Sequence, residues 1–307
     1  GGLDASGARA LTPSDPDCRE AARRLRGWGA TPWLTLTNDR VARPGEPPVL
    51  KDGDLVHAIL ADAVRQRAHR KAIVDVSAAV GVRGVDLDYE NLDPGDRALF
   101  SSFAASLAEE LHVRGMLLSV TVQPKTGESH ARGSGAMDWK ALCSCADRVQ
   151  VMLYNQHNAS TPPGPIAEPD WIQAVLRYGR GQCPQDRLVP VLKVIGMYWG
   201  PAHAEWVDHG TAVARAAKAG ARVRRVRDGK TPWFSYRAAD GDHVVYFEDA
   251  RSLRAKMAVA AGFGHQLQHD AAHRRVQIGR RFVEDRQGRL RGQRRRDRQL
   301  LPHPRRH

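Results

Sequence analysis

The segment VDLDYEN at residues 85–91 alternates apolar and acidic side chains with the two-residue period of a β-strand. Asp86, Asp88 and Glu90 are therefore expected on one face of the strand, about 6–7 Å from one carboxyl group to the next. Carboxyl groups this close resist simultaneous ionisation, so at least one of them tends to keep its proton. A row of this kind suits general acid catalysis, and the alternative is an edge strand with a solvated acidic face.

The segments around this strand alternate between strand-like and helix-like patterns. Apolar residues at two-residue spacing predict strands, and apolar residues three or four positions apart predict helices. The other expected strands are residues 31–38, 116–123, 149–154 and 188–195. The expected helices are residues 18–28, 55–80, 96–111, 139–146, 171–178 and 203–219. Repeated strand–helix units predict an α/β protein with a parallel sheet and right-handed crossovers.

The length of 307 residues and the number of these units favour a (β/α)8 TIM barrel over a doubly wound sheet, without excluding the latter. No Gly-x-Gly-x-x-Gly motif follows an expected strand, which argues against a dinucleotide site. In a barrel, chemistry takes place at the carboxyl ends of the strands. Glu90, Gln123, Tyr154 and residues 197–199 all lie at such ends, so the sequence predicts an active site where these ends meet.

The formal net charge of +13 is concentrated at the end of the chain. Residues 265–307 contain thirteen arginines, no lysine and four acidic residues, which accounts for +9 of the total. A nucleic-acid-binding function would rest on this segment alone, and a disordered tail following a catalytic domain at residues 1–264 is the preferred interpretation. No apolar run of about 18 residues predicts a membrane span, and no signal-peptide pattern occurs in this chain.

The cysteines do not form a recognisable metal site. Cys18, Cys143, Cys145 and Cys183 include no C-x-x-C pair and no histidine at zinc-ligand spacing. They are expected to be buried thiols, with one disulfide among them as a further option. Neither a metal nor an organic cofactor is expected.

The acidic strand and a later tyrosine-containing strand resemble the signatures of glycoside hydrolase family 18, the chitinase and N-acetylglucosaminidase family. Residues 83–90, RGVDLDYE, match the family pattern D-G-x-D-x-D-x-E except at the first position, and residues 152–155, MLYN, match M-x-Y-D except at the last. The surrounding features resemble most the bacterial branch associated with spore germination and cortex lysis. These features are ND at 38–39, VTVQPK at 120–125, GPIA at 164–167 and GMYW at 196–199.

This resemblance implies a glycosidase that hydrolyses β-1,4-linked N-acetylglucosamine polymers, either chitin or peptidoglycan glycan strands, by substrate-assisted retaining catalysis. Glu90 would act as general acid and then as general base. Asp88 would orient the 2-acetamido group of the substrate, and Asp86 would hold the proton of Asp88. Tyr154 would hydrogen-bond the acetamido oxygen. The residues expected to bind substrate beside them are Gln123, Met152, Asn155, Tyr198 and Trp199.

The same resemblance implies a monomer that binds a polysaccharide and acts outside the cell or in the cell envelope. The alternative from another class is a catalytically weakened carbohydrate-binding protein on the same barrel. Retention of Glu90 argues against this alternative, since non-catalytic relatives commonly lose the acid. Loss of a tryptophan that floors the sugar subsite in the family argues for it.

Three departures from the family pattern carry expectations of their own. Arg83 replaces an aspartate at the entry of the strand, where a structural effect is expected. Asn155 replaces an aspartate after Tyr154 and so removes a charge. After Gly264 the family's last strand and its subsite tryptophan do not follow, so the tail is expected to be out of register, as a frameshift would produce. The first barrel strand is expected upstream of Gly1, which leaves the barrel incomplete at both ends.

Overall fold

The structure is a computed structural model, and it describes residues 2–3, 10–11, 16–40, 49–184, 186–226 and 230–263. Near the start of the chain, β1 (Gly2–Leu3) pairs with β2 (Ala10–Leu11), and helix α1 (Pro16–Gly27) follows. The arginine-rich segment 265–307 lies outside the described residues. Its predicted disorder, its shifted reading frame and the domain boundary before it therefore stay predictions.

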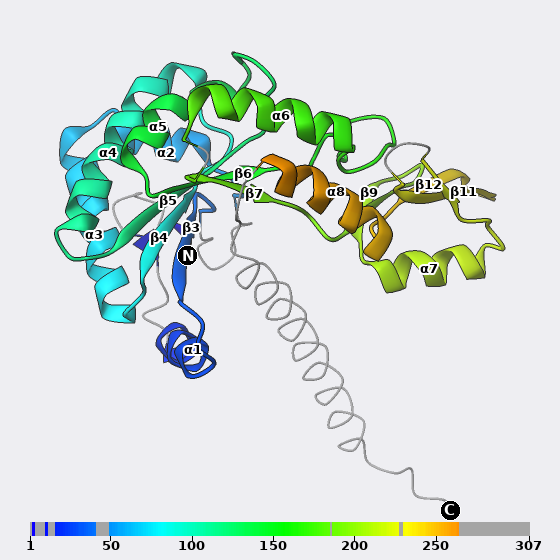
Figure 1. The fold of residues 1–307 in the computed structure, drawn as a ribbon, viewed down its shortest axis with the longest axis horizontal. Helices are drawn as coiled ribbons and strands as arrows, with labels where there is room; N and C mark the ends of the chain where they lie inside the picture. The colour runs from blue at the N-terminus through cyan, green and yellow to red at the C-terminus, as the bar shows by residue number, and fades with distance from the viewer. Residues whose placement is uncertain are drawn as a thin grey trace, which may run out of the picture. The chain divides into compact units, whose positions relative to one another are not determined.

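Five parallel strands form the sheet that carries the acidic segment (Figure 1). They are β3 (Trp33–Thr37), β4 (Gly84–Asp88), β5 (Leu117–Val122), β6 (Arg148–Met152) and β7 (Leu188–Val191), side by side in chain order. A doubly wound sheet reverses its strand order at a switch point, whereas a barrel adds each strand beside the previous one. The α/β class is confirmed, and the order is that of a barrel wall. Within the described residues this sheet does not close into a ring.

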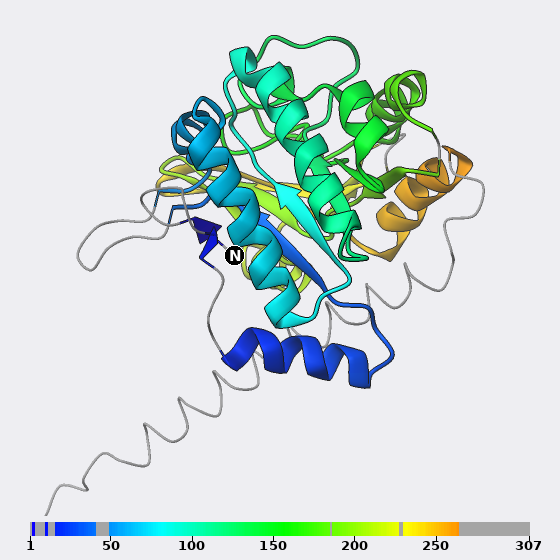
Figure 2. The same cartoon turned by 90° about the vertical axis from the view of Figure 1, so that its left-hand side faces the viewer.

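Helices pack along one face of this sheet, as Figure 1 and Figure 2 show for those beside β4. Val85, Leu87 and Tyr89 are fully buried on that face. The ring of Tyr89 lies 6.4 Å from that of Phe100, and its hydroxyl shares a 2.6 Å hydrogen bond with Nε2 of His69. The apolar side of the acidic segment is thus held by helices, and its carboxyl groups point away from them. The helices of this layer are α2 (Gly53–Leu60), α3 (Ala63–Val80), α4 (Arg97–His112), α5 (Trp139–Cys145) and α6 (Pro169–Gln182).

The single helix expected at residues 55–80 is wrong, because α2 and α3 are separate helices. Asp62 lies between them, and its carboxylate accepts hydrogen bonds from the backbone N–H groups of Val64 at 2.7 Å and Arg65 at 3.1 Å. An aspartate that caps a new helix in this way ends the preceding one. Helix α3 ends at Gly81, which adopts the left-handed conformation that favours glycine, with φ at 72°.

A second, antiparallel sheet follows the parallel one. Its strands are ordered β10 (Arg224–Arg225), β11 (Pro232–Ala238), β12 (Gly241–Tyr246), β8 (Gly196–Trp199) and β9 (Ala204–Val207). Residues 197–199, which were expected at the end of a barrel strand, lie instead inside β8 of this sheet. The last described helix is α8 (Ala250–Phe263).

Two predicted elements of this region are too long. The strand expected at residues 188–195 is β7, which ends at Val191. The helix expected at 203–219 begins only with α7 (His209–Lys218), because residues 204–207 form β9. Asp208 marks the change, since its carboxylate accepts a 2.9 Å hydrogen bond from the backbone N–H of Thr211. Residues 204–207 were predicted as part of the helix that follows them, and this prediction is wrong.

One disulfide is present among the four cysteines. Cys143 of α5 is bonded to Cys183, just after α6, and their Cα atoms are 5.5 Å apart. Cys18 and Cys145 are free thiols, each partly buried. The option of one disulfide is therefore confirmed. None of the helices that the structure describes is both long and apolar enough to cross a membrane.

Candidate active site

The expected site residues lie where neighbouring parallel strands end. Asp88 is the last residue of β4 and Glu90 follows it, Gln123 follows β5, and Tyr154 follows β6. Because these strands are adjacent and parallel, their carboxyl ends meet at one edge of the sheet. Nε2 of Gln123 lies 3.4 Å from Oε2 of Glu90, and the charges of Asp88 and Glu90 help to raise the pKa of Tyr154. The structure thus brings these four residues together.

Asp86 is buried beneath the site and anchored by two threonines. The hydroxyl of Thr121 on β5 lies 3.2 Å and 3.1 Å from its two carboxylate oxygens. Thr35, which is opposite Asp86 in the register of β3 and β4, lies 3.5 Å from one of them. Only 5% of Asp86 is exposed, so little of it is open to a substrate.

Asp88 has a strongly perturbed carboxyl group. Burial raises its pKa to about 6, and the charges of Glu90 and Asp86 add to the effect. Its Oδ1 is buried and has no hydrogen-bond partner in the described part of the protein. Buried polar atoms are normally paired, so an unpaired oxygen at the end of a strand is suited to receive a donor from a ligand.

Glu90 is held by its backbone and by its carboxylate. The side-chain amide of Asn38 donates to the Glu90 carbonyl at 2.8 Å, and the Glu90 N–H donates to Oδ1 of Asn38 at 2.9 Å. The ammonium group of Lys51 lies 2.6 Å from Oε1 of Glu90, and 15% of the Glu90 side chain is exposed. An acid that is fixed in position and open to one side can reach a substrate atom.

Lys51 was not predicted as a site residue, although it contacts the expected acid. Its backbone has a positive φ of 54°, and that of Asn91 has a positive φ of 59°. The Lys51 N–H donates to Oδ1 of Asp39 at 2.9 Å, and the Asn91 amide donates to the Lys51 carbonyl at 3.3 Å. From the sequence, the ND pair at 38–39 was interpreted as the end of a strand and as part of the family resemblance. Neither interpretation indicates that Asp39 binds the backbone of a lysine that contacts Glu90.

Gln123 is packed from behind by a glycine. At Gly133, where φ is 84°, an added Cβ would come within 2.0 Å of Oε1 of Gln123. The absence of a side chain at this position therefore leaves the space in which the Gln123 amide lies beside Glu90.

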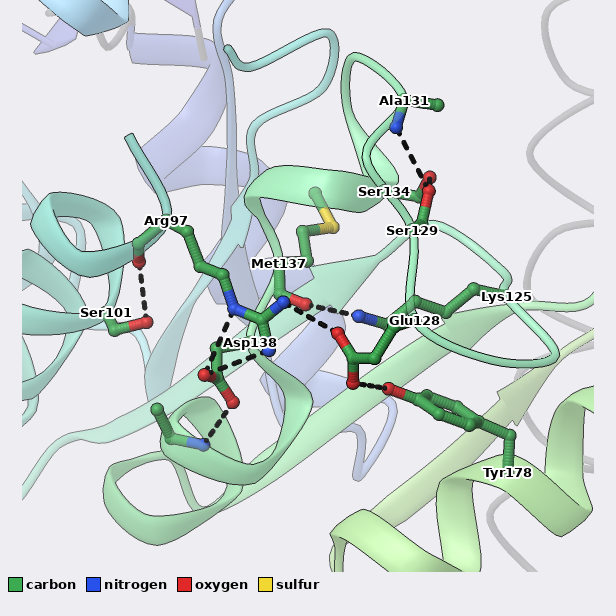
Figure 3. A network of polar contacts seen from close by, with 11 residues as sticks. Arg97, Ser101, Lys125, Glu128, Ser129, Ala131, Ser134, Met137, Asp138 and Tyr178 are labelled. Atoms are coloured by element: carbon green, nitrogen blue, oxygen red, sulfur yellow. Dashed lines mark hydrogen bonds and ion pairs between the residues drawn. The ribbon is translucent and has the colours of Figure 1, made fainter. Parts of the chain in front are cut away.

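A network of charged groups ties down the loop that runs from Gln123 to α5 (Figure 3). Arg97 of α4 contacts Glu128 at 2.7 Å and Asp138 at 3.1 Å, and the Tyr178 hydroxyl donates to Glu128 at 2.7 Å. Lys125, buried within the loop, donates from Nζ to the Met137 carbonyl at 2.8 Å. These contacts fix both ends of the loop and thereby the position of Gln123.

The residues after β6 form the second side of the site. Burial, followed by the nearby carboxylates, raises the pKa of Tyr154 above its ordinary value, so its hydroxyl stays protonated and can donate a hydrogen bond. Asn155 has φ at 67°, and its buried Oδ1 has no hydrogen-bond partner in the described residues. Met152 is buried, with 4% exposed, and packs below the site.

Tyr198 and Trp199 point to opposite faces of β8. The Tyr198 hydroxyl shares a 2.6 Å hydrogen bond with Nδ1 of His243, and its ring packs in the core of the antiparallel sheet, so the structure does not bring it to the carboxylates. Trp199 lies on the face that Tyr154 packs against, and its indole N–H donates to the Asn158 carbonyl at 3.1 Å. With 8% of Trp199 exposed, little of its ring is free to stack on a sugar.

Among the residues that the structure describes, no three or more His, Cys, Asp or Glu side chains are grouped so that they could hold a metal ion. The site residues described above present carboxyl, amide, phenol and ammonium groups.

Comparison with known proteins gives a consistent result. Residues 54–264 match the sequence profile of the family described as glycosyl hydrolases family 18. The chain is 30% identical over 212 residues to the cortical fragment-lytic enzyme of Bacillus anthracis. The aligned region covers 66% of this chain and 49% of that protein. The chain spans about half the length of the curated relatives it matches.

Two solved structures show the same architecture. The chitinase from Chromobacterium violaceum has a TM-score of 0.76 and 27% identity, covering 85% of this chain and 81% of that one. The Bacillus cereus spore cortex-lytic enzyme SleL has a TM-score of 0.71 and 26% identity, and the match covers 85% of this chain and 60% of that one. The family and these neighbours support the predicted (β/α)8 barrel fold, to which the described residues contribute five consecutive parallel strands.

Proposed function

Because this chain belongs to family 18 of the glycosyl hydrolases, we propose that it hydrolyses the β-1,4 bonds of a polysaccharide containing N-acetylglucosamine, either chitin or peptidoglycan. The observation that supports this most directly is the buried, unpaired Oδ1 of Asp88 in the carboxyl row that ends at Glu90. The N–H of a 2-acetamido group is a donor of the kind this oxygen lacks. A sugar that carries such a group would complete the hydrogen bonding of the site.

In the first half of the reaction, Glu90 donates its proton to the glycosidic oxygen. The acetamido carbonyl oxygen of the substrate attacks the anomeric carbon as the bond to the leaving sugar breaks, which gives a cyclic oxazolinium ion. Asp88 accepts the acetamido N–H, and its carboxylate stabilises the positive charge of this ion. Tyr154 donates to the acetamido oxygen and fixes its direction of attack.

In the second half, water attacks the anomeric carbon from the side that the leaving sugar vacated. Glu90, now ionised, takes a proton from this water, the ring of the intermediate opens, and the acetamido group is restored. Two inversions at the same carbon give net retention of configuration. Lys51 contacts one carboxylate oxygen of Glu90 and so helps to hold this group in position.

The direct test is hydrolysis of a chromogenic N-acetylglucosamine oligomer by the purified protein and by its Glu90→Gln variant. We expect cleavage by the wild type and a loss of at least about 100-fold in the variant, because the acid is removed and the shape is kept. A matching oligomer without N-acetyl groups should not be cleaved. Cleavage of both oligomers at similar rates would contradict substrate assistance.

A carbohydrate-binding function with weak catalysis is the second candidate. It is favoured by the near-complete burial of Trp199 and by the placement of Tyr198 away from the site, so neither of these two expected rings is free to stack on a sugar. A folded wild type that binds the oligomer without cleaving it would support this candidate over hydrolysis.

We further propose that the protein acts outside the cytoplasm, in the cell envelope or beyond it. The Cys143–Cys183 disulfide supports this location, because structural disulfides persist mainly in oxidising compartments. The monomeric state stays a prediction, which the elution volume and light scattering of the purified protein would test.

A further inference from the structure

Lys193 is a cation that the family signatures do not account for. It lies just after β7, at the same edge of the parallel sheet as Glu90 and Tyr154. Its Nζ is 4.8 Å from the centre of the Tyr154 ring and 3.4 Å from the centre of the Trp206 ring. Trp206 belongs to β9 and is 42% exposed, so the ammonium group lies between the expected catalytic tyrosine and a tryptophan that is open to solvent.

Within the described part of the chain, Lys193 has no carboxylate at ion-pair distance. Lys51 is paired with Glu90, and the buried Lys256 is paired with Glu248. Lys125 is buried without a carboxylate contact, but its ammonium group donates to a backbone carbonyl. In these described residues, the direct contacts of the Lys193 ammonium group are the faces of two aromatic rings, which attract a cation without neutralising it.

The surroundings of Lys193 favour an incoming anion. Burial lowers its pKa, and the positive charge of Lys51 acts in the same direction, while the charge of Glu90 opposes both without cancelling them. A half-buried ammonium group in this position gains free energy when a carboxylate binds beside it, because the carboxylate replaces lost hydration and offsets the repulsion. A hydroxyl group of a neutral sugar provides much less of this compensation.

We propose that Lys193 binds a carboxylate on the sugar next to the cleaved N-acetylglucosamine, so that the site prefers an anionic glycan of the peptidoglycan class over neutral chitin. This inference rests on the glycosidase function proposed above. The carboxylate has two sources in such a glycan, the lactyl ether of the muramic acid residue and the end of a short peptide attached to it. Both present the same group, and they differ in their reach from the sugar ring.

The test compares glycans that differ only in charge. The substrates are a soluble N-acetylglucosamine–N-acetylmuramic acid tetrasaccharide with free lactyl carboxylates, its methyl ester, and its L-alanyl derivative. We expect wild-type kcat/KM to be about tenfold or more higher for the free acid than for the ester, the size of one charge-assisted hydrogen bond. A higher value for the L-alanyl derivative than for the free acid would assign the carboxylate to the peptide.

Variants then assign the preference to Lys193. In Lys193→Met the ratio of acid to ester should fall to near one, and Lys193→Arg should keep most of it. Lys140→Met, a change at an exposed lysine of α5, should leave the ratio at the wild-type value. A wild type without preference for the acid would overturn the proposal. So would a Lys193→Met variant that loses activity on acid and ester equally, because Lys193 would then act through Tyr154.

The proposal remains testable if the wild type cleaves none of these glycans, which would count against the proposed hydrolysis itself. Calorimetric titration of the Glu90→Gln protein with the acid and the ester measures recognition without turnover. The inference would be supported if the Glu90→Gln protein binds the acid more tightly than the ester, and if adding Lys193→Met removes this difference. Equal affinities of the Glu90→Gln protein for acid and ester would refute it.

Discussion

The ammonium group of Lys51 lies 2.6 Å from a carboxylate oxygen of Glu90, the residue that would donate the proton to the glycosidic bond. This contact fixes the direction in which the Glu90 carboxyl group points. Removing the ammonium group should therefore loosen the position of the group that transfers the proton.

We expect Lys51→Met to lower kcat/KM about tenfold, because Glu90 loses the charge-assisted contact that fixes its carboxyl group. About half of the Lys51 side chain is exposed, so high salt should reduce the difference between variant and wild type. The measurement is oligomer hydrolysis at low and at high salt, with Lys140→Met as the matched change. Equal kcat/KM in Lys51→Met and wild type would show that the ion pair does not position the acid.

Thr121 should matter for turnover through the buried Asp86. Thr121→Val removes the hydroxyl that contacts both Asp86 oxygens and keeps the shape of the side chain. We expect kcat to fall about tenfold with little change in KM, because one hydrogen bond to a charged group is lost below the site. Thr35→Val removes a longer, 3.5 Å contact and should have a smaller effect. Equal losses in the two variants would contradict this ranking.

Asp88 should make the protein less stable as pH rises. Folding raises its pKa from 3.8 to about 6, so the folded state binds the proton more tightly than the unfolded state. The stabilising effect of that proton is full below pH of about 4 and is lost by pH of about 6, at a cost of about 1–3 kcal/mol after allowance for solvent screening.

The Asp88→Asn variant removes this ionisation. We expect it to be inactive, yet to unfold at a higher temperature than the wild type at pH 8 and at about the same temperature at pH 4. Thermal unfolding at both pH values is the measurement. Asp75→Asn, at an exposed ion pair with Lys71, should show no such gain at pH 8.

Gly133 and Gly115 offer a matched pair for testing the position of Gln123. Both have positive φ, at 84° and 68°, so an alanine costs about 1 kcal/mol of stability at either place. Only at Gly133 would the new Cβ meet Gln123. Gly133→Ala should therefore lower kcat several-fold, whereas Gly115→Ala should leave kcat unchanged. If the two variants differ only in stability, the contact between Gln123 and Glu90 has no catalytic effect.

The disulfide should contribute measurably to stability. Cys143 and Cys183 are 40 residues apart, and closing a loop of this length is worth up to about 4 kcal/mol. We expect Cys143→Ala with Cys183→Ala to lower the free energy of unfolding by about 2–4 kcal/mol in urea titrations. Cys145→Ala, at a free thiol, is the comparison, and reductant should lower the stability of that variant but not of the double variant.

The sequence predicted the parts of the fold that depend on local pattern. Strand periodicity placed Asp86 and Asp88 on the face opposite Leu87, and the structure confirms this because the helices bury only the apolar face. The break at Asp62 was missed because a capping aspartate interrupts the apolar repeat too briefly to alter the helical pattern. The antiparallel sheet was missed because β8 and β9 are short and lie next to helical sequence.

The site residues that the sequence predicted are those that lie at the ends of predicted strands. Glu90, Gln123 and Tyr154 follow consecutive parallel strands, so the topology alone brings them near each other. Lys51 and Lys193 reach the site from loops, through contacts between residues far apart in the chain. The sequence does not distinguish a loop lysine that faces solvent from one that faces a carboxylate. Tyr198 and Trp199 point in opposite directions because they are neighbours in the strand β8. The sequence had suggested that these residues end a strand of the parallel sheet, whereas β8 belongs to the antiparallel sheet.

The chain order of β3 to β7 has a consequence for how the protein is made. Each strand after β3 pairs with the one before it, so every new strand finds its partner among residues that have already left the ribosome. The parallel sheet can therefore grow in the direction of synthesis, one strand–helix unit at a time. The signature strand β4, with Asp86 and Asp88, gains both of its neighbours once β5 emerges. The acidic row would thus be assembled before β6 and β7 join the sheet.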